Sequence, residues 1–211
     1  MTDTAPTLAR EAASEHAPAL DGLRGVAVLL VITWHWDLPW KGFPLDRGLL
    51  GVRLFFALSG FLITSILLGG RGLLAGGEAT LGGFARAFYA RRLLRIFPLY
   101  YGTLAVLWAL DVAGVRDEML WHLTYATSLL VARENHWIGI TSHFWSLSVE
   151  EHFYLLWPWA VLLAPRRALP WLFGTVALGG ALWRSVGLFA GLGRYALLYT
   201  LPGSLDALGV G

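Results

Sequence analysis

The stretch HFWSLSVEEHFYLLWP, residues 143–158, decides how the rest of this sequence is interpreted. Its apolar residues are as dense as those of a membrane helix, yet two adjacent carboxylates, Glu150 and Glu151, stand near its middle. A carboxylate within a membrane helix is energetically costly and normally faces a polar cavity or a charged partner. The stretch therefore predicts a membrane-spanning helix that supplies an acid to a buried site.

The composition of the whole chain agrees with a location in the lipid bilayer. Hydrophobic residues make up 56% of the 211 residues and charged residues only 14%, which leaves too little polar side chain to cover a soluble globule. The net charge of +2 gives no reason to expect a nucleic-acid partner, and none is predicted. The chain has no cysteine, which excludes disulfides, thiolate metal ligands and a thiol nucleophile.

The apolar segments predict an all-α fold, a polytopic transmembrane helix bundle with about six spanning helices. A spanning helix needs about 20 apolar residues, and such segments lie near residues 22–40, 48–68, 97–114, 144–164, 168–190 and 195–211. The shorter segment 119–131 is predicted to be a re-entrant or interfacial helix. Residues 1–19 form a polar tail that is predicted to be disordered, and residues 20–211 form the transmembrane domain.

The distribution of arginines predicts how the chain is oriented. Residues 69–96 are rich in arginine and contain a single acid, Glu78, whereas residues 37–48 are close to neutral. Because positively charged connections remain in the cytoplasm, residues 69–96 and the amino terminus are predicted to be cytoplasmic. Segment 144–164 must then run inward, and segment 119–131 must lie at the outer face.

The first predicted helix, LDGLRGVAVLLVITWHW (residues 20–36), contains Arg24 and His35, with Asp21 as its predicted N-cap. The two side chains are about 16 Å apart along a helix axis and therefore lie at different depths. In one interpretation, Arg24 extends to the inner headgroups and His35 lies among tryptophans at the outer interface. In the other, His35 is a general base, because a neutral imidazole is well suited to removing a hydroxyl proton.

The helix that contains Glu150 presents a line of polar groups. Helical periodicity places three of them on one face, with Glu151 on a neighbouring face: Ser146, Glu150 and Tyr154. Glu150 is a functional-site candidate by default. The alternative is a structural ion pair with an arginine of another helix, such as Arg53 or Arg184.

Three further residues are candidates for the site. Arg92 and Arg95 lie three apart and either mark a cytoplasmic helix entrance, with Pro98 in the first turn of the next helix, or form a fork for phosphate oxygens. Asp206 follows a Pro-Gly break in an apolar run, which predicts a broken helix that lines a cavity. No paired His or Cys spacing indicates a metal site, and no GxSxG motif indicates a serine hydrolase.

Four separated blocks together resemble the bacterial acyltransferase 3 family of membrane-bound O-acyltransferases, which modify cell-surface glycans. The blocks are residues 20–36, the segment LGVRLFFALSGFLIT at 50–64, the segment RRLLRIFPLYY at 91–101, and residues 144–158. They occur in the order that the family has. They extend over nearly the whole chain from Leu20, and the chain resembles the first part of the domain, apparently truncated within an apolar segment.

This resemblance implies a location in the bacterial inner membrane and an acyltransferase activity. It implies that an acyl group, acetyl above all, moves from cytoplasmic acyl-CoA (acetyl-CoA) to a hydroxyl of an extracytoplasmic glycan or glycolipid, without a metal cofactor. His35 corresponds to the catalytic base and Glu150 to the acid of the family, and Arg24, Arg92 and Arg95 correspond to its arginines that serve the donor. His152 and Arg53 depart from residues that many members have.

A second hypothesis from another functional class stays open. The same histidine and acid could relay protons in a transporter or flippase for a lipid-linked sugar. That hypothesis predicts movement of the substrate without any dependence on CoA, and it leaves the arginine pair as markers of orientation.

Overall fold

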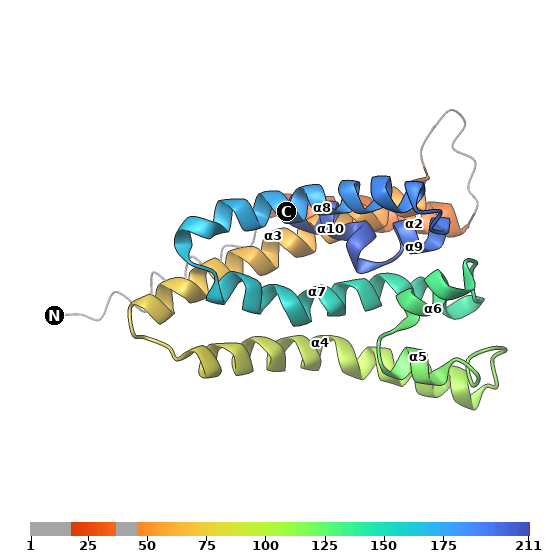
Figure 1. Ribbon diagram of the computed structural model, residues 1–211. Coiled ribbons are helices and arrows are strands. Elements are labelled where there is room, and N and C mark those ends of the chain that lie inside the picture. The colour runs from red at the N-terminus through yellow and green to blue at the C-terminus, as the bar shows by residue number, and fades with distance from the viewer. Residues whose placement is uncertain (1–17, 37–45) are drawn as a thin grey trace. The chain divides into compact units, whose positions relative to one another are not determined.

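The computed structural model describes residues 18–36 and 46–211, and these residues form helices and no strand (Figure 1). The all-α prediction is therefore confirmed for the described part of the chain. The predicted polar tail lies outside the described residues except for its last two, which already belong to a helix. The chain divides into two compact units, Met1–Phe55 and Phe56–Gly211, and each unit is described by itself.

The first unit contains α2 (Pro18–His35) and the first turns of α3 (Arg47–Ala75). The two helices approach closely, because a side chain at Gly51 would collide with the backbone oxygen of Ala27. Small residues at such contacts are typical of packing between membrane helices. Asp21 lies inside α2 rather than before it, so the predicted N-cap is wrong.

In the second unit, the rest of α3 forms an antiparallel hairpin with α4 (Leu81–Ala109), as Figure 1 shows. Residues 76–80 connect the two helices. The hydroxyl of Thr80 caps α4 by accepting a hydrogen bond from the Gly83 N–H at 3.1 Å. A threonine at this position satisfies a backbone donor that the first helical turn leaves without a partner.

The third long helix, α7 (Phe144–Leu163), runs parallel to α3 and antiparallel to α4. The parallel direction follows from contacts in which the residue numbers rise together on both helices: Phe56 with Trp145, Thr64 with Trp157, and Arg71 with Ala164. The contacts with α4 run in the opposite order: Tyr100 with Phe144, and Tyr89 with Leu155. These relative directions are the ones that the predicted orientation requires.

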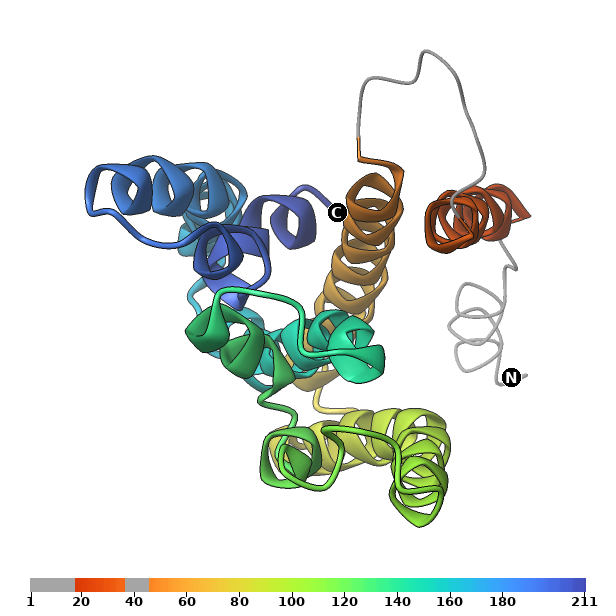
Figure 2. The ribbon, with the colours of Figure 1, turned by 90° about the vertical axis from the view of Figure 1, so that its right-hand side faces the viewer.

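Two short helices, α5 (Met119–Leu123) and α6 (Thr127–Glu134), connect the end of α4 to the start of α7. The 3-10 helix η1 (Ile140–His143) follows them. In Figure 2 this end of the unit faces the viewer, with α5 and α6 in green. Segment 119–131 was predicted to be one short helix, and a turn at Tyr125 divides it. The backbone φ of Tyr125 is +54°, which is rare for a large side chain.

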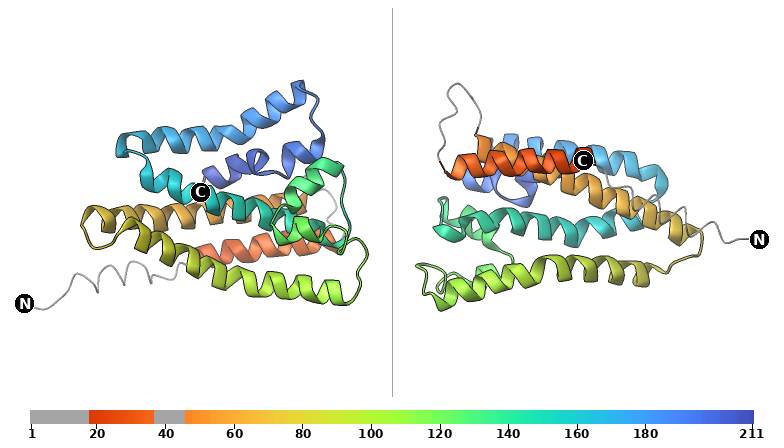
Figure 3. Two further views of the ribbon diagram at one scale, coloured as in Figure 1. Left: turned by 60° about the horizontal axis from the view of Figure 1, so that its bottom comes forward. Right: turned by 180° about the vertical axis from the view of Figure 1, so that it is seen from behind.

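After α7 come η2 (Arg166–Ala168), α8 (Leu169–Phe189) and the short α9 (Arg194–Leu198). The last helix, α10 (Leu201–Gly209), packs along α8 (Figure 3). The prediction of a spanning helix over residues 195–211 is wrong. The nine residues of α10 extend about 14 Å, less than half of the roughly 30 Å hydrocarbon core.

The boundaries of α4 also differ from the prediction. The helix begins at Leu81 rather than near residue 97, so the arginine-rich residues that were predicted to connect two helices form its first half. Pro98 lies inside the helix and not in its first turn. Arginine, alanine and leucine all favour the helical conformation, which explains why the helix extends beyond the apolar segment.

Two described helical segments are long and apolar enough to cross a membrane, Arg47–Ala75 and Arg166–Phe189. The first has 29 residues and extends about 43 Å, more than the thickness of the hydrocarbon core. The fold therefore agrees with a membrane-embedded helix bundle. The other spanning helices stay predictions, apart from the one over residues 195–211.

Candidate active site

Glu150 of α7 is bound to α3 through a serine. The Ser59 hydroxyl donates a hydrogen bond to Glu150 Oε1 at 2.8 Å, and the Tyr154 hydroxyl donates to Ser59 Oγ at 3.0 Å. Tyr154 is almost fully buried, with 2% of its surface exposed. These groups form a chain of hydrogen bonds between two apolar helices, which satisfies polar atoms that would otherwise be costly to bury.

Local structure explains why these groups meet. Glu150 and Tyr154 are four residues apart on one face of α7, as predicted. Ser59 precedes Gly60, where a side chain would collide with the backbone carbonyl of Leu208 in α10. Sequence reasoning missed Ser59, although a serine beside a glycine in the middle of the apolar block 50–64 was an available signal.

Two arginines of α4 act on the same cluster. The guanidinium of Arg92 lies over the ring of Tyr154, with Cζ 4.2 Å from the ring centroid. The charges of Arg92 and Arg95 both interact with Glu150, and Arg92 also interacts with Glu151. Arg92 lies about 16 Å along α4 from its first residue. The pair therefore lies within α4 and not at its first turn, and its charges accompany the acid. Both interpretations of the pair, as a marker of the cytoplasmic side and as a fork for phosphate oxygens, stay predictions.

Arg24 and His35 belong to α2, in the first unit. Arg24 forms an exposed ion pair with Asp21 at 2.7 Å. The Nδ1 atom of His35 lies 2.8 Å from the Val31 carbonyl oxygen. Because a carbonyl only accepts hydrogen bonds, Nδ1 must carry the proton, and Nε2 is left as the basic nitrogen. That His35 and Glu150 act together stays a prediction, because the two units are described separately.

Ser146 and Asp206 have other partners. The Ser146 hydroxyl donates to the carbonyl of His143 at 3.1 Å, one turn back along the chain. Asp206 pairs with Arg184 of α8 at 2.6 Å, and the same guanidinium donates to the Gly203 carbonyl. The predicted break in this apolar run is present, just before α10. Asp206 joins α10 to α8 through its ion pair with Arg184.

A second buried polar cluster lies under α5 and α6 and was not predicted. His122 is completely buried, and its Nδ1 lies 2.9 Å from Thr127 Oγ1 while its Nε2 lies 3.6 Å from Glu118 Oε2. The Tyr100 hydroxyl donates to the His122 carbonyl at 2.8 Å. Burial, followed by the charge of His143, lowers the pKa of His122 to about 4. The imidazole is therefore neutral at physiological pH.

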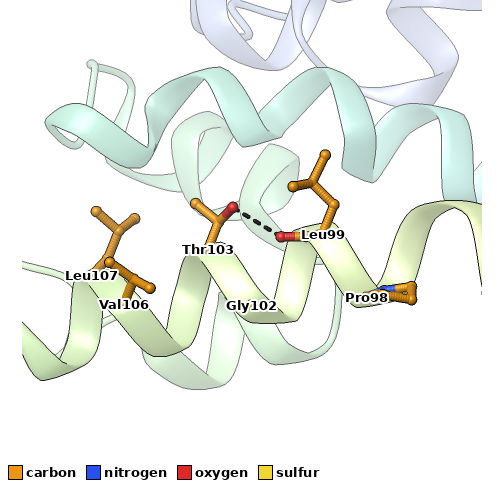
Figure 4. A pocket seen from close by; sticks show the side chains of 6 residues that line it. All are labelled: Pro98, Leu99, Gly102, Thr103, Val106 and Leu107. Atoms are coloured by element: carbon orange, nitrogen blue, oxygen red, sulfur yellow. Dashed lines mark hydrogen bonds between the residues drawn. The ribbon is translucent and has the colours of Figure 1, made fainter.

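An open groove of about 340 Å³ lies along one face of α4 (Figure 4). Its lining comes entirely from this helix: Pro98, Leu99, Gly102, Thr103, Val106 and Leu107. The Thr103 hydroxyl donates to the Leu99 carbonyl at 2.8 Å, so its hydrogen bond is made within the helix. The groove contains no ionisable side chain, and we assign no chemistry to it. Within residues 18–36 and 46–211, no three His, Asp or Glu side chains form a group that could hold a metal ion.

Comparison with known proteins gives the class of this chain. The profile of the acyltransferase 3 family, described as an acyltransferase domain, matches residues 18–205. The match covers most of the sequence, and the chain therefore belongs to this family. The resemblance seen in the four sequence blocks is confirmed.

Two individual members of the family are similar to this chain over most of its length. The chain is similar to a putative peptidoglycan O-acetyltransferase of Bacillus subtilis (strain 168), with 37% identity over 161 residues. It is also similar to a peptidoglycan O-acetyltransferase of Listeria monocytogenes, with 32% identity over 159 residues. Each alignment covers 68% of this chain but only 23% or 24% of the relative. The chain thus spans about a quarter of the length of these relatives. No solved structure matches it significantly.

Proposed function

We propose that the protein transfers an acyl group, acetyl above all, from acyl-CoA to a hydroxyl of an extracytoplasmic cell-wall glycan. The observation that carries this proposal is the partly buried carboxylate of Glu150, held by Ser59 between apolar helices and accompanied by two arginine charges. A charged group of this kind within a membrane bundle is typical of a functional site. Membership of the acyltransferase 3 family and relatives named as peptidoglycan O-acetyltransferases support the reaction class.

The proposal includes an orientation in the bacterial inner membrane. We propose that α2, α3, α4, α7 and α8 cross the bilayer within a transmembrane domain that begins near residue 20. The connection between α3 and α4 and the amino terminus lie in the cytoplasm, and α5 and α6 lie at the outer face. The antiparallel direction of α4 and α7 supports this arrangement, because α5 and α6 then join two helices at one membrane surface.

The arginines are proposed to bind the donor. Arg92 and Arg95 carry positive charge beside the acid, where a forked guanidinium can hold phosphate oxygens of acyl-CoA. Arg24, near the start of α2, is proposed to contribute at the cytoplasmic side. The donor would enter between the helices with its thioester directed toward the outer half of the bundle.

The proposed reaction is a direct transfer. His35 Nε2 removes the proton from the acceptor hydroxyl, whose oxygen forms a bond with the acyl carbon while the C–S bond of the thioester breaks. The CoA thiolate leaves and takes up a proton to become the free thiol. The negative charge of Glu150 is proposed to stabilise the imidazolium that forms. The tautomer of His35, with the proton on Nδ1, supports this role for Nε2.

The test is transfer of labelled acetyl from acetyl-CoA to peptidoglycan in membranes that contain the protein as its gene encodes it. We expect transfer by the wild type and its loss in His35→Ala and Glu150→Gln. The matched controls are His136→Ala and Glu134→Gln, which change exposed residues of the same types. Absence of transfer by the wild type with several acyl-CoAs and glycan acceptors would contradict the proposal. Movement of a lipid-linked sugar without CoA would then identify a transporter.

A further inference from the structure

Tyr125 is held in an unusual conformation by the aromatic side chains of α4. Its ring stacks on Tyr100 at a centroid distance of 4.2 Å and on Phe97 at 5.5 Å. The residue is 6% exposed, and its backbone lies in the left-handed region that large side chains rarely adopt. Residues kept in such conformations are concentrated at functional sites. The turn between α5 and α6 therefore places the Tyr125 ring against α4.

Several buried polar atoms around this turn lack hydrogen-bond partners among the described residues, and two of them interact with each other. The Tyr125 hydroxyl and Glu151 Oε1 are both shielded from solvent, and neither has a hydrogen-bond partner among the described residues. The two groups interact electrostatically, and Glu151 also interacts with Arg92. Buried polar groups are nearly always hydrogen-bonded, so these two atoms indicate a missing ligand group or water.

We propose that Tyr125 and Glu151 form a subsite that binds hydroxyl groups of the sugar acceptor. This inference rests on the proposed function and adds the residues that recognise its acceptor. A phenol donates and a carboxylate accepts, so the hydroxyl groups of one ligand can satisfy both atoms. A ligand at this position needs no charge of its own, because Arg92 already offsets the charge of Glu151. A neutral polyhydroxyl ligand is the class that these charges favour.

The location of the subsite agrees with this assignment. Glu151 follows Glu150 directly in α7, so the proposed subsite is adjacent to the proposed reaction centre. Arg92 interacts with both acids. Tyr125 belongs to the connection that closes one end of the α4–α7 pair, and the α3–α4 loop lies at the other end (Figure 1). In the proposed orientation that end faces the outside, from which a cell-wall glycan would arrive.

The experiment measures acetyl transfer by the full protein in detergent micelles. The acceptor is the N-acetylglucosaminyl-N-acetylmuramic acid disaccharide with its lactyl carboxyl group amidated, which makes it neutral. Tyr125→Phe should raise the KM for the disaccharide about fivefold, and Glu151→Gln should raise it about tenfold, because a hydrogen bond to a charged group is stronger. The KM for acetyl-CoA should not change. The matched control is Tyr100→Phe, whose hydroxyl already donates to the His122 carbonyl and should leave the disaccharide KM unchanged.

The possible results separate the two proposals. If the wild type transfers acetyl and both variants keep its disaccharide KM, the subsite holds only water, the inference is wrong and the proposed function stands. If the wild type transfers no acetyl, the proposed function fails, and equilibrium binding of radiolabelled disaccharide without donor decides the subsite. Weaker binding by both variants than by Tyr100→Phe would support it. Equal binding, or none by the wild type, would overturn it.

Discussion

Acidification should lower the free energy of unfolding of this protein. Replacing His122 by asparagine should make that decrease smaller by about 3 kcal/mol. His122 is completely buried between Thr127 and Glu118, and burial together with the charge of His143 lowers its pKa to about 4. The usual pKa of histidine is about 6.5, which is the value expected in the unfolded chain. The folded protein therefore resists a protonation that the unfolded chain accepts.

The sign and size of the effect follow from this difference. Between about pH 6.5 and about pH 4 the unfolded state binds the additional proton, so the free energy of unfolding decreases as the pH falls. Above pH 6.5 neither state is protonated at His122, and its contribution is constant. Each pH unit of difference between the two pKa values corresponds to about 1.4 kcal/mol, so the total loss is about 3 kcal/mol.

Glu118 has the opposite effect on the pH dependence of stability, and its contribution must be distinguished from that of His122. Burial, followed by the charges of Glu134 and Asp117, raises the pKa of Glu118. A carboxyl group with a raised folded-state pKa contributes stability at low pH that is lost as the pH rises through that pKa. Comparing the wild type with His122→Asn cancels this contribution. The asparagine side chain can keep a hydrogen bond to Thr127 but cannot be protonated.

The assay is denaturant unfolding in detergent micelles between about pH 7 and about pH 4.5, where the two states differ in proton binding at His122. The wild type should lose more stability than His122→Asn across this interval. His136→Asn is the control, because His136 is exposed and its Nδ1 lies 2.9 Å from the Trp137 carbonyl oxygen in the same loop. Equal pH dependence of the wild type and His122→Asn would refute the reasoning.

Three further perturbations test the packing and the site. Arg184→Met should reduce the free energy of unfolding by about 2–3 kcal/mol, because it leaves Asp206 partly buried without its ion pair; chemical unfolding checks this. Gly60→Ala should cost about 1–3 kcal/mol, since the added methyl group would collide with the Leu208 carbonyl; the same measurement applies. Ser59→Ala should lower kcat for acetyl transfer roughly tenfold or more while the KM for acetyl-CoA changes little, because the acid loses a hydrogen bond that fixes its position.

Sequence periodicity predicted a large part of the candidate site. The four-residue spacing of Glu150 and Tyr154 placed both on one face of α7, and both meet Ser59 there. Ser59 itself was not predicted, because a serine in an apolar helix most often bonds to its own backbone. Its role depends on the parallel pairing of α3 and α7, and no local pattern in the sequence shows which helices are neighbours.

Helix boundaries were predicted less well, for two physical reasons. The arginines of α4 lower the apolar character of residues 81–96, although arginine is a good helix former, so hydropathy placed the start of the helix too late. In the last segment the apolar run continues, but the helix α9 ends at Leu198 and α10 begins at Leu201. Hydropathy cannot detect that interruption, whereas Pro202 at the start of α10 does indicate it.

The parallel pairing of α3 and α7 affects the order in which the protein can acquire its site during synthesis. Ser59 and Glu150 are 91 positions apart in the chain, and α4, α5 and α6 are made between them. The Ser59 hydroxyl therefore has no carboxylate partner until α7 has left the ribosome and entered the bundle. A nascent chain that has inserted only its first helices presents a polar serine to its surroundings. The hydrogen bond between Ser59 and Glu150 can therefore form only after α7 has been inserted.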